Sequence, residues 1–176
     1  MGYLELNMKR ILKILIPKYG RVGKLFFETS IITEIGKIGL LADESHLLEI
    51  SFFGLEGLST RGQRDQSRFD REAKEIKEYF EGNRKEFNIK FKINCTRFTT
   101  KVLFYLRSIP YGSTLSYLEV AKNIDNNNAA RAVGNACGKN PLPLLIPCHR
   151  VVASKGLGGF GGGLERKKFL LNLESN

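Results

Sequence analysis

The residues best suited to chemistry are Cys148, His149 and Arg150, which follow one another directly. A cysteine acts as a nucleophile in its thiolate form, which positive neighbours stabilise, and a nearby base can accept the thiol proton. Three prolines within residues 141–147 exclude a helix before the cysteine and stiffen the chain that presents it. The segment therefore predicts a positioned cysteine nucleophile.

Two features qualify this interpretation. The same pattern also fits a buried, inert cysteine beside a hydrogen-bonded histidine. Neighbouring side chains of an extended segment point to opposite faces, so Cys148 and His149 need not touch, and a bridging water can link them.

A glycine-dense segment, residues 156–163, follows the cysteine and carries Phe160 in its midst. Glycines let backbone N–H groups approach a ligand closely, and a phenylalanine ring can stack on a flat base. The alternative is a flexible loop with one anchoring aromatic side chain.

The cysteine and histidine counts bear on redox state and metals. The chain has three cysteines and two histidines, and no C-x-x-C pair. An odd number of cysteines in a chain this long is not a disulfide framework, so we expect a cytoplasmic protein. We expect no metal site, because too few ligands stand at suitable spacing.

Composition limits the class of protein. With 176 residues, 42% of them hydrophobic, the chain suits one full domain or two small ones. We expect neither a signal peptide nor a membrane helix, since the start lacks a basic region and no apolar run is long enough. The net charge of +10 suggests a polyanionic partner, most often nucleic acid, although it also fits simple solubility.

Residues 1–94 predict an α/β domain with a small antiparallel sheet. Four β-rich stretches between residues 24 and 53 are separated by turn signals and indicate a meander. Ser67 is expected to cap a helix with one apolar stripe, which Gly82 ends. Residues 85–93 alternate apolar and polar side chains, as in a strand or an extended linker.

Residues 95–176 predict a mostly helical domain. Thr96 can cap a first helix, and Ser116 with Glu119 forms a capping-box pattern at the start of a second. An asparagine-rich turn and a small-residue helix, residues 129–137, then suggest a helix-turn-helix, a signal that any helical hairpin also gives. Cys137 on this helix is interpreted as a small packing residue.

The last helix is expected to be amphipathic and to span residues 164–173. Glu174 falls near its end, where the helix dipole disfavours a carboxylate. This carboxylate therefore either has a partner or is exposed to solvent.

The second half closely resembles the O6-alkylguanine-DNA alkyltransferases, also called methylated-DNA–protein-cysteine methyltransferases. The resemblance covers about residues 96–174 and is specific in its Pro-Cys-His-Arg-Val run, with Ala-Arg-Ala-Val-Gly upstream. The first half resembles only the family's looser α/β domain. The matching segments are residues 109–112, 116–117, 129–134, 138–141 and 146–151.

The resemblance implies irreversible, single-turnover transfer of the alkyl group from O6-alkylguanine in DNA to a cysteine. By this resemblance Cys148 is the acceptor, and His149 activates it through a water. Glu174 orients the imidazole, and Asn140 helps to hold the site together. The implied partner is double-stranded DNA, with no cofactor, and the protein is expected to be a monomer.

The resemblance also implies minor-groove binding by the helix-turn-helix and flipping of the damaged nucleotide. Tyr117 is associated with turning out the nucleotide, and Arg131 fills the gap left in the stack. Phe160 stands where many relatives have tyrosine, and Gly161 where many have serine. The further residues implied to face DNA or the base are Ala129, Ala130, Ala132, Gly134, Pro143, Val151, Phe160, Gly161 and Lys167.

Three other functions remain in view. A catalytically silent DNA-binding relative flags lesions, but in such relatives the acceptor cysteine is replaced. A cysteine–histidine hydrolase needs an oxyanion hole and an orienting third group. A basic transcription factor needs the helix-turn-helix but no reactive thiol.

Overall fold

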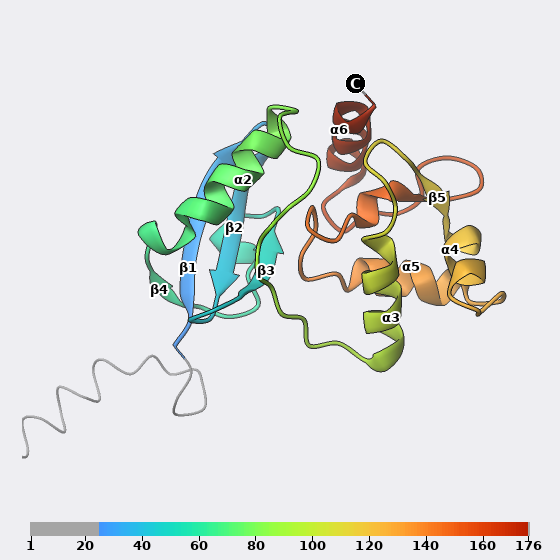
Figure 1. Cartoon of the computed structure of the whole chain (residues 1–176), viewed down its shortest axis with the longest axis horizontal. Coiled ribbons are helices and arrows are strands. Elements are labelled where there is room, and N and C mark those ends of the chain that lie inside the picture. The colour runs from blue at the N-terminus through green and yellow to red at the C-terminus, as the bar shows by residue number, and fades with distance from the viewer. Residues whose placement is uncertain (1–24, 176) are drawn as a thin grey trace, which may run out of the picture.

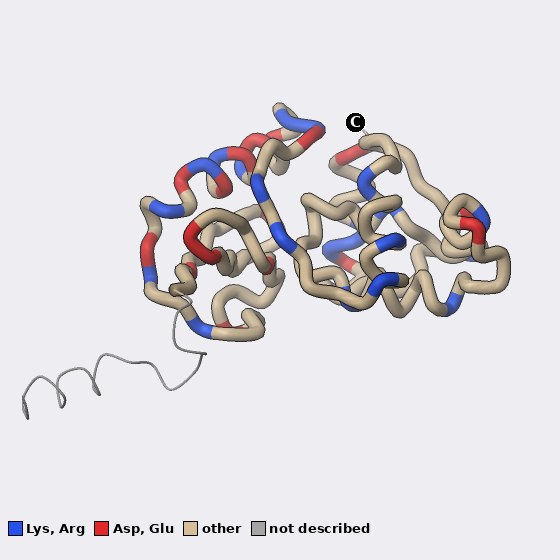
Figure 2. The backbone as a smooth tube through the Cα atoms, turned by 60° about the horizontal axis from the view of Figure 1, so that its bottom comes forward, with Lys and Arg blue, Asp and Glu red and all other residues tan. Residues whose placement is uncertain are grey.

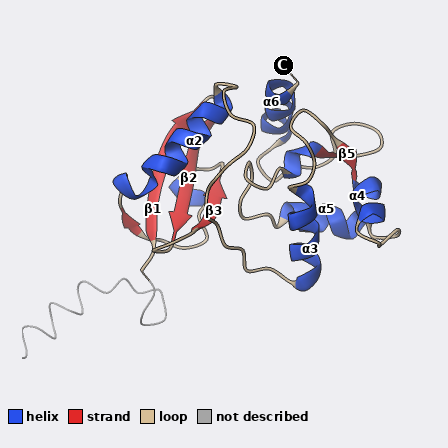
Figure 3. Cartoon of the chain, in the orientation of Figure 1, coloured by secondary structure: helices blue, strands red, loops and turns tan. Residues whose placement is uncertain are grey.

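The computed structural model describes residues 25–175. The start of the chain, where we expect no signal peptide, lies outside these residues. Two lobes lie side by side, one a sheet with a helix across it and the other a group of short helices (Figure 1). Figure 3 shows that the strands gather mainly in the first lobe.

The sheet begins with the predicted meander, which has three strands because the first two of the four β-rich stretches merge into one. Strands β1 (Phe27–Thr33), β2 (Gly36–Ala42) and β3 (Leu47–Ser51) pair antiparallel in chain order. A fourth strand, β4 (Gln63–Arg64), pairs parallel with β1, giving the order β3-β2-β1-β4. Two residues are too few to show an alternating pattern, so the sequence gives no signal for β4.

Helix α2 (Asp70–Phe80) covers the sheet, and the predicted helix is confirmed (Figure 1). The prediction that Ser67 caps it is wrong. A 3₁₀ turn, Ser67–Phe69, precedes α2, and the Ser67 hydroxyl instead donates to Asp65 Oδ1 at 2.7 Å. Gly82 follows the helix with φ 75°, the left-handed conformation expected after a helix end.

An extended linker joins the two lobes. It passes beside β3, where Leu47 N donates to Lys90 O at 2.9 Å and Lys92 N donates to Leu47 O at 3.0 Å. The expected alternation over residues 85–93 therefore corresponds to a linker that adds one short bridge to the sheet.

The second lobe is mostly helical, as predicted. Its two short strands pair parallel and tie the segment after the cysteine to the start of α4. The elements are α3 (Arg97–Leu106), β5 (Leu115–Ser116), α4 (Tyr117–Asn123), α5 (Ala130–Gly138), β6 (Val151–Val152) and α6 (Leu164–Glu174).

The predicted caps of this lobe are confirmed. Thr96 Oγ1 accepts from Thr99 N at 3.3 Å at the start of α3. At the start of α4, Ser116 Oγ accepts from Glu119 N at 3.1 Å, and Glu119 Oε2 accepts from Ser116 N at 2.6 Å. Each bond satisfies a backbone N–H that the helix leaves free.

The two lobes share one hydrophobic core. A single cluster of buried side chains includes Ile76 of α2, Leu103 of α3 and Leu170 of α6. The rings of Phe80 and Phe169 meet across the boundary with centroids 6.3 Å apart. The first lobe is therefore packed against the elements that carry the cysteine. Within residues 25–175, no helix is long and apolar enough to cross a membrane.

We predict that Gly39→Ala destabilises the fold. A Cβ at Gly39 would lie 2.2 Å from the backbone oxygen of Gly54, so strand β2 or its neighbour must move. The expected loss is about 2 kcal/mol in the free energy of unfolding, measured by urea denaturation. Gly138→Ala is the control, because a Cβ there has no atom within 4 Å. Equal losses in the two variants would contradict the packing argument.

Candidate active site

The cysteine lies on a buried, stiff segment that ends in a turn. Residues 142–150 are all buried, and Leu144 has φ 77°, which is rare for a branched side chain. Cys148–Arg150 form a 3₁₀ turn, not the extended segment that the sequence suggests. The alternation of side chains between faces therefore does not apply to Cys148 and His149.

Asn140 holds the Cys148 thiol. Its Nδ2 donates to Cys148 Sγ at 3.2 Å and to Ile146 O at 2.8 Å, while its Oδ1 accepts from Leu142 N at 3.0 Å. Burial raises the pKa of Cys148, and the Asn140 hydrogen bond and the Lys167 charge oppose that rise. The thiol is thus kept protonated until a base takes its proton.

A buried histidine and a buried carboxylate form a hydrogen-bonded pair next to the cysteine. His149 Nε2 lies 2.8 Å from Glu174 Oε1, and both side chains are almost fully buried. Burial would raise the pKa of Glu174, but hydrogen bonds from His149 and Arg150 outweigh it and hold that pKa well below its usual value. Glu174 is therefore ionised, which settles the open question of whether it has a partner.

The charge on Glu174 fixes the state of the imidazole. An ionised carboxylate only accepts hydrogen bonds, so His149 Nε2 carries the hydrogen. Burial lowers the pKa of His149, against the opposing effect of Glu174. The neutral ring then has its lone pair at Nδ1, which has no hydrogen-bond partner among the described residues. His149 is thus set up to accept a proton at Nδ1.

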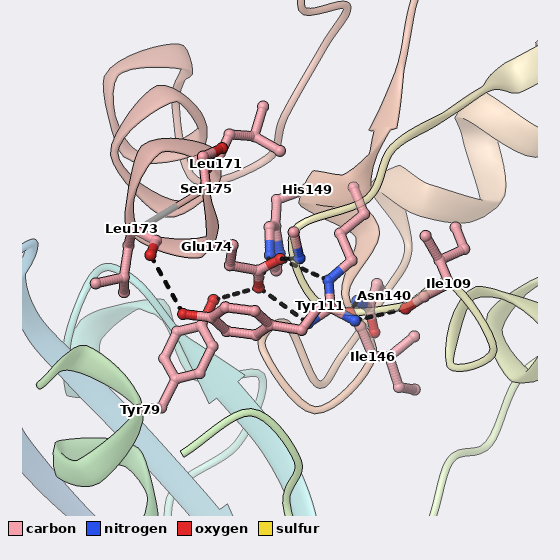
Figure 4. Close-up of polar contacts among 12 residues, drawn as sticks. Tyr79, Ile109, Tyr111, Asn140, Ile146, His149, Leu171, Leu173, Glu174 and Ser175 are labelled. Carbon is pink, nitrogen blue, oxygen red and sulfur yellow. Dashed lines mark hydrogen bonds and ion pairs between the residues drawn. The ribbon is translucent and has the colours of Figure 1, made fainter. Parts of the chain in front are cut away.

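Glu174 receives further donors from three segments (Figure 4). Arg150 Nε donates to Oε2 at 2.8 Å and its Nη2 to Oε1 at 2.9 Å. Tyr79 Oη donates to Oε1 at 2.7 Å, and Gly112 N donates to Oε2 at 3.2 Å. The contact of Tyr79 with Glu174 has no signal in the sequence, since a tyrosine on the apolar stripe of a helix does not reveal a partner far along the chain.

A cavity of about 400 Å³ opens onto Cys148. Six of the residues expected to act on the base or the DNA line it. They come from α4, from α5 and from the glycine-dense segment of residues 156–163, which we call the glycine loop. They are Tyr117, Ala130, Arg131, Gly134, Phe160 and Gly161. A second hollow of about 260 Å³ adds Pro143, and Cys137 and Cys148 line both.

Close packing positions the glycine loop on Tyr117. Tyr117 Oη donates to Gly159 O at 3.3 Å. Gly158 has φ 69°, and a Cβ there would lie 2.8 Å from the Tyr117 ring. Phe160 packs against Phe52 of the first lobe with ring centroids 5.6 Å apart. The loop is therefore anchored on both sides, which disfavours the alternative of a flexible loop. Phe52 is a neighbour that the sequence does not indicate.

Four predicted residues do not reach either hollow, and the fourth, Lys167, is described below. Ala129 and Ala132 are not among the lining residues, although Ala132 is exposed on α5. Val151 is fully buried, and its carbonyl accepts a hydrogen bond from Lys167.

From residue 25 onward, the net positive charge lies on the second lobe. Residues 97–176 hold eleven Lys and Arg against four Asp and Glu, whereas residues 25–96 hold eleven against thirteen. Most acidic positions accordingly fall in the first lobe (Figure 2). The lobe that carries the cysteine is therefore the one suited to a polyanion.

Two family models match the chain. Residues 26–93 match the ribonuclease-like domain of 6-O-methylguanine DNA methyltransferase, and residues 97–176 match its DNA binding domain. The methylated-DNA–protein-cysteine methyltransferase of Methanosarcina acetivorans is 40% identical over 146 residues, which cover 81% of this chain and 94% of the relative. The chain belongs to the methylated-DNA–protein-cysteine methyltransferase family.

Solved structures agree with this assignment. The Mycobacterium tuberculosis O6-methylguanine methyltransferase has a TM-score of 0.79 and 36% identity, covering 87% of this chain and 93% of its own. The M. tuberculosis OGT in complex with DNA also has a TM-score of 0.79, with 38% identity over 85% of this chain and 92% of its own. The expected family and two-lobe fold are thus confirmed.

Lys167 has an internal position in this methyltransferase. It is buried, and its Nζ donates to Val151 O at 2.6 Å, Leu157 O at 2.6 Å and Gly159 O at 3.1 Å. The prediction that Lys167 contacts DNA is wrong, because all three ammonium donors point to backbone carbonyls. Its charge instead ties α6 to the glycine loop.

We predict that Lys167→Met loosens the glycine loop. The variant leaves three carbonyls without their shared donor, so we expect a loss of about 3 kcal/mol in the free energy of unfolding. Amide hydrogen exchange within residues 156–163 should also become faster. The neighbouring Lys168→Met is the control, since Lys168 is exposed. Unchanged loop exchange in Lys167→Met would contradict the assigned role.

Proposed function

We propose that this protein repairs DNA by moving the alkyl group from O6 of an alkylated guanine to Cys148. The observation that carries the proposal is the cavity that ends at Cys148, with Asn140 on the sulfur and the His149–Glu174 pair behind it. The Sγ–carbon bond forms as the carbon–O6 bond breaks. The thiol proton leaves Cys148, and guanine regains a proton at N1, so the reaction balances.

His149 is the base of this reaction. Its neutral ring offers the Nδ1 lone pair, which takes the Cys148 proton through a water. Glu174 keeps the hydrogen on Nε2 and stabilises the imidazolium that forms. Asn140 donates to the sulfur and favours the thiolate over the thiol.

The reaction ends after one transfer. The product on Cys148 is a thioether, which water does not hydrolyse under physiological conditions. The alkyl group comes from the DNA itself, so the reaction needs no cofactor. The protein is accordingly consumed stoichiometrically. We further propose that it acts in the cytoplasm and as a monomer.

Helices α4 and α5 and the turn between them bind the DNA. They act as a helix-turn-helix in the minor groove. A base buried in a duplex must leave the stack before its O6 can react. Exposed Ala132 lets the backbone of α5 approach a shallow groove, and exposed Arg131 at the cavity rim replaces the lost stacking. Tyr117 supports the extruded nucleotide inside the cavity.

Other functions fit the site less well. Cys148 is present and faces a cavity, which disfavours a silent lesion-binding relative. A transcription factor that uses only the helix-turn-helix has no use for a thiol held by Asn140. A hydrolase would need turnover, and its acyl-enzyme would have to react with water.

We predict that Cys148→Ala abolishes alkyl transfer and retains DNA binding. Phosphate and groove contacts supply most of the affinity and lie away from the sulfur. Transfer is measured with a duplex bearing O6-methylguanine, and affinity with the same duplex by fluorescence anisotropy. Stoichiometric methyl transfer by the variant would contradict the assignment of Cys148.

We predict that Arg131→Ala slows repair of a duplex more than reaction with a free O6-alkylguanine base. Only the duplex requires a side chain to fill the vacated stack, and extrusion costs a few kcal/mol, so we expect a loss of roughly tenfold or more. Rates on the two substrates are compared in single-turnover assays. An equal loss on both would indicate that Arg131 has only a structural role.

A further inference from the structure

The first lobe places one polar group inside the reaction centre. Tyr79 lies on α2 and is fully buried, and its hydroxyl donates to Glu174 Oε1 at 2.7 Å across 95 residues of chain. Figure 4 shows the Tyr79 ring rising from the first lobe toward the Glu174 carboxylate. The contact joins a residue of the sheet lobe to the carboxylate that holds His149.

Aromatic packing fixes where the Tyr79 hydroxyl lies. Its ring meets those of Phe80, Phe87 and Tyr111 at centroid distances of 5.5, 5.3 and 6.2 Å. Burial, and then the Glu174 charge, raise the pKa of Tyr79, so the hydroxyl stays protonated and acts as a donor. The donor is thus rigid and constant in charge.

Glu174 Oε1 is shared among three donors. Tyr79 Oη, His149 Nε2 and Arg150 Nη2 lie 2.7, 2.8 and 2.9 Å from it. Each donor draws on the same negative charge, so the strength of one bond depends on the others. A change at Tyr79 therefore reaches His149 through a single oxygen atom.

We propose that Tyr79 is a positioning residue, through which the first lobe sets how Glu174 holds and polarises His149. The inference rests on the proposed function in assigning His149 as the base. It also gives the first lobe a part in the chemistry beyond support, because its α2 helix supplies one of the donors to the carboxylate that controls the base.

The expected effect of Tyr79→Phe has a definite sign. Phenylalanine keeps the ring contacts and removes only the hydroxyl. Glu174 Oε1 then accepts one hydrogen bond fewer, so its negative charge acts more strongly on His149. This stabilises the imidazolium and raises the pKa of His149. The other groups facing this pair are Arg150 on the turn, Lys167 on α6, Tyr111 and Cys148, and all remain in the variant.

The test follows His149 and the reaction separately in the full-length protein. The chain has two histidines, so NMR titration resolves His149, with His46 as an internal reference. Single-turnover transfer from an O6-methylguanine duplex is measured against pH in parallel. Tyr111→Phe is the matched control, because its hydroxyl donates to Leu173 O at 3.2 Å and not to Glu174.

In Tyr79→Phe we expect His149 to titrate at higher pH and the acid limb of the rate profile to move with it. At a pH on that limb the rate should fall roughly threefold to tenfold, as for a base whose pKa rises by up to one unit. The rate on the alkaline side should change less. Tyr111→Phe should leave both the His149 titration and the rate profile as in the unmodified protein.

An unchanged His149 titration in folded Tyr79→Phe would overturn the inference, and so would a shift in His149 without a shift in the rate profile.

If the unmodified protein transfers no alkyl group, the proposed function fails, and the titration alone decides whether Tyr79 acts on His149. If Tyr79→Phe does not fold, the unmodified protein still gives a test. The Tyr79 hydroxyl proton should then show a nuclear Overhauser effect to the His149 Nε2 proton, and its absence would overturn the inference.

Discussion

The buried carboxylate of Glu174 is the constraint on which the site depends. An ionised carboxylate removed from water costs several kcal/mol unless donors surround it. Its donors come from α2, from the loop before β5 and from the turn that carries the cysteine, through Tyr79, Gly112, His149 and Arg150. Satisfying one charge at the end of α6 therefore draws both lobes and the turn of Cys148 into one arrangement.

This arrangement also bears on the reactivity that we propose for the buried Cys148 thiol. Burial raises the pKa of Cys148, so the thiol does not ionise freely, and Asn140 supplies only part of the opposing stabilisation. In the proposed reaction the remaining help comes from His149, which its own burial keeps neutral and whose lone pair lies at Nδ1. The chemistry we propose is thereby confined to a substrate that reaches Cys148 through the cavity.

Local signals in the sequence predicted much of the fold, and the Pro-Cys-His-Arg-Val run pointed to the family to which the chain belongs. Caps such as Thr96 and Ser116 depend on neighbours three residues away, so their patterns are readable. Burial that depends on residues far apart in the chain leaves no such pattern. Lys167 looks like a surface lysine of an amphipathic helix, yet its ammonium group donates to three backbone carbonyls that lie outside that helix. Tyr79 likewise looks like a core aromatic, because only the packed lobes bring it to Glu174.

The other proposed roles all depend on Cys148 accepting an alkyl group from DNA. The most direct test incubates the purified protein with a duplex bearing one O6-methylguanine, followed by intact-mass and peptide mass spectrometry. We expect a gain of one methylene mass per protein, located on the peptide that holds Cys148, together with an unmodified guanine in the duplex. A methylated residue other than Cys148, or lesion binding with no transfer, would contradict this expectation.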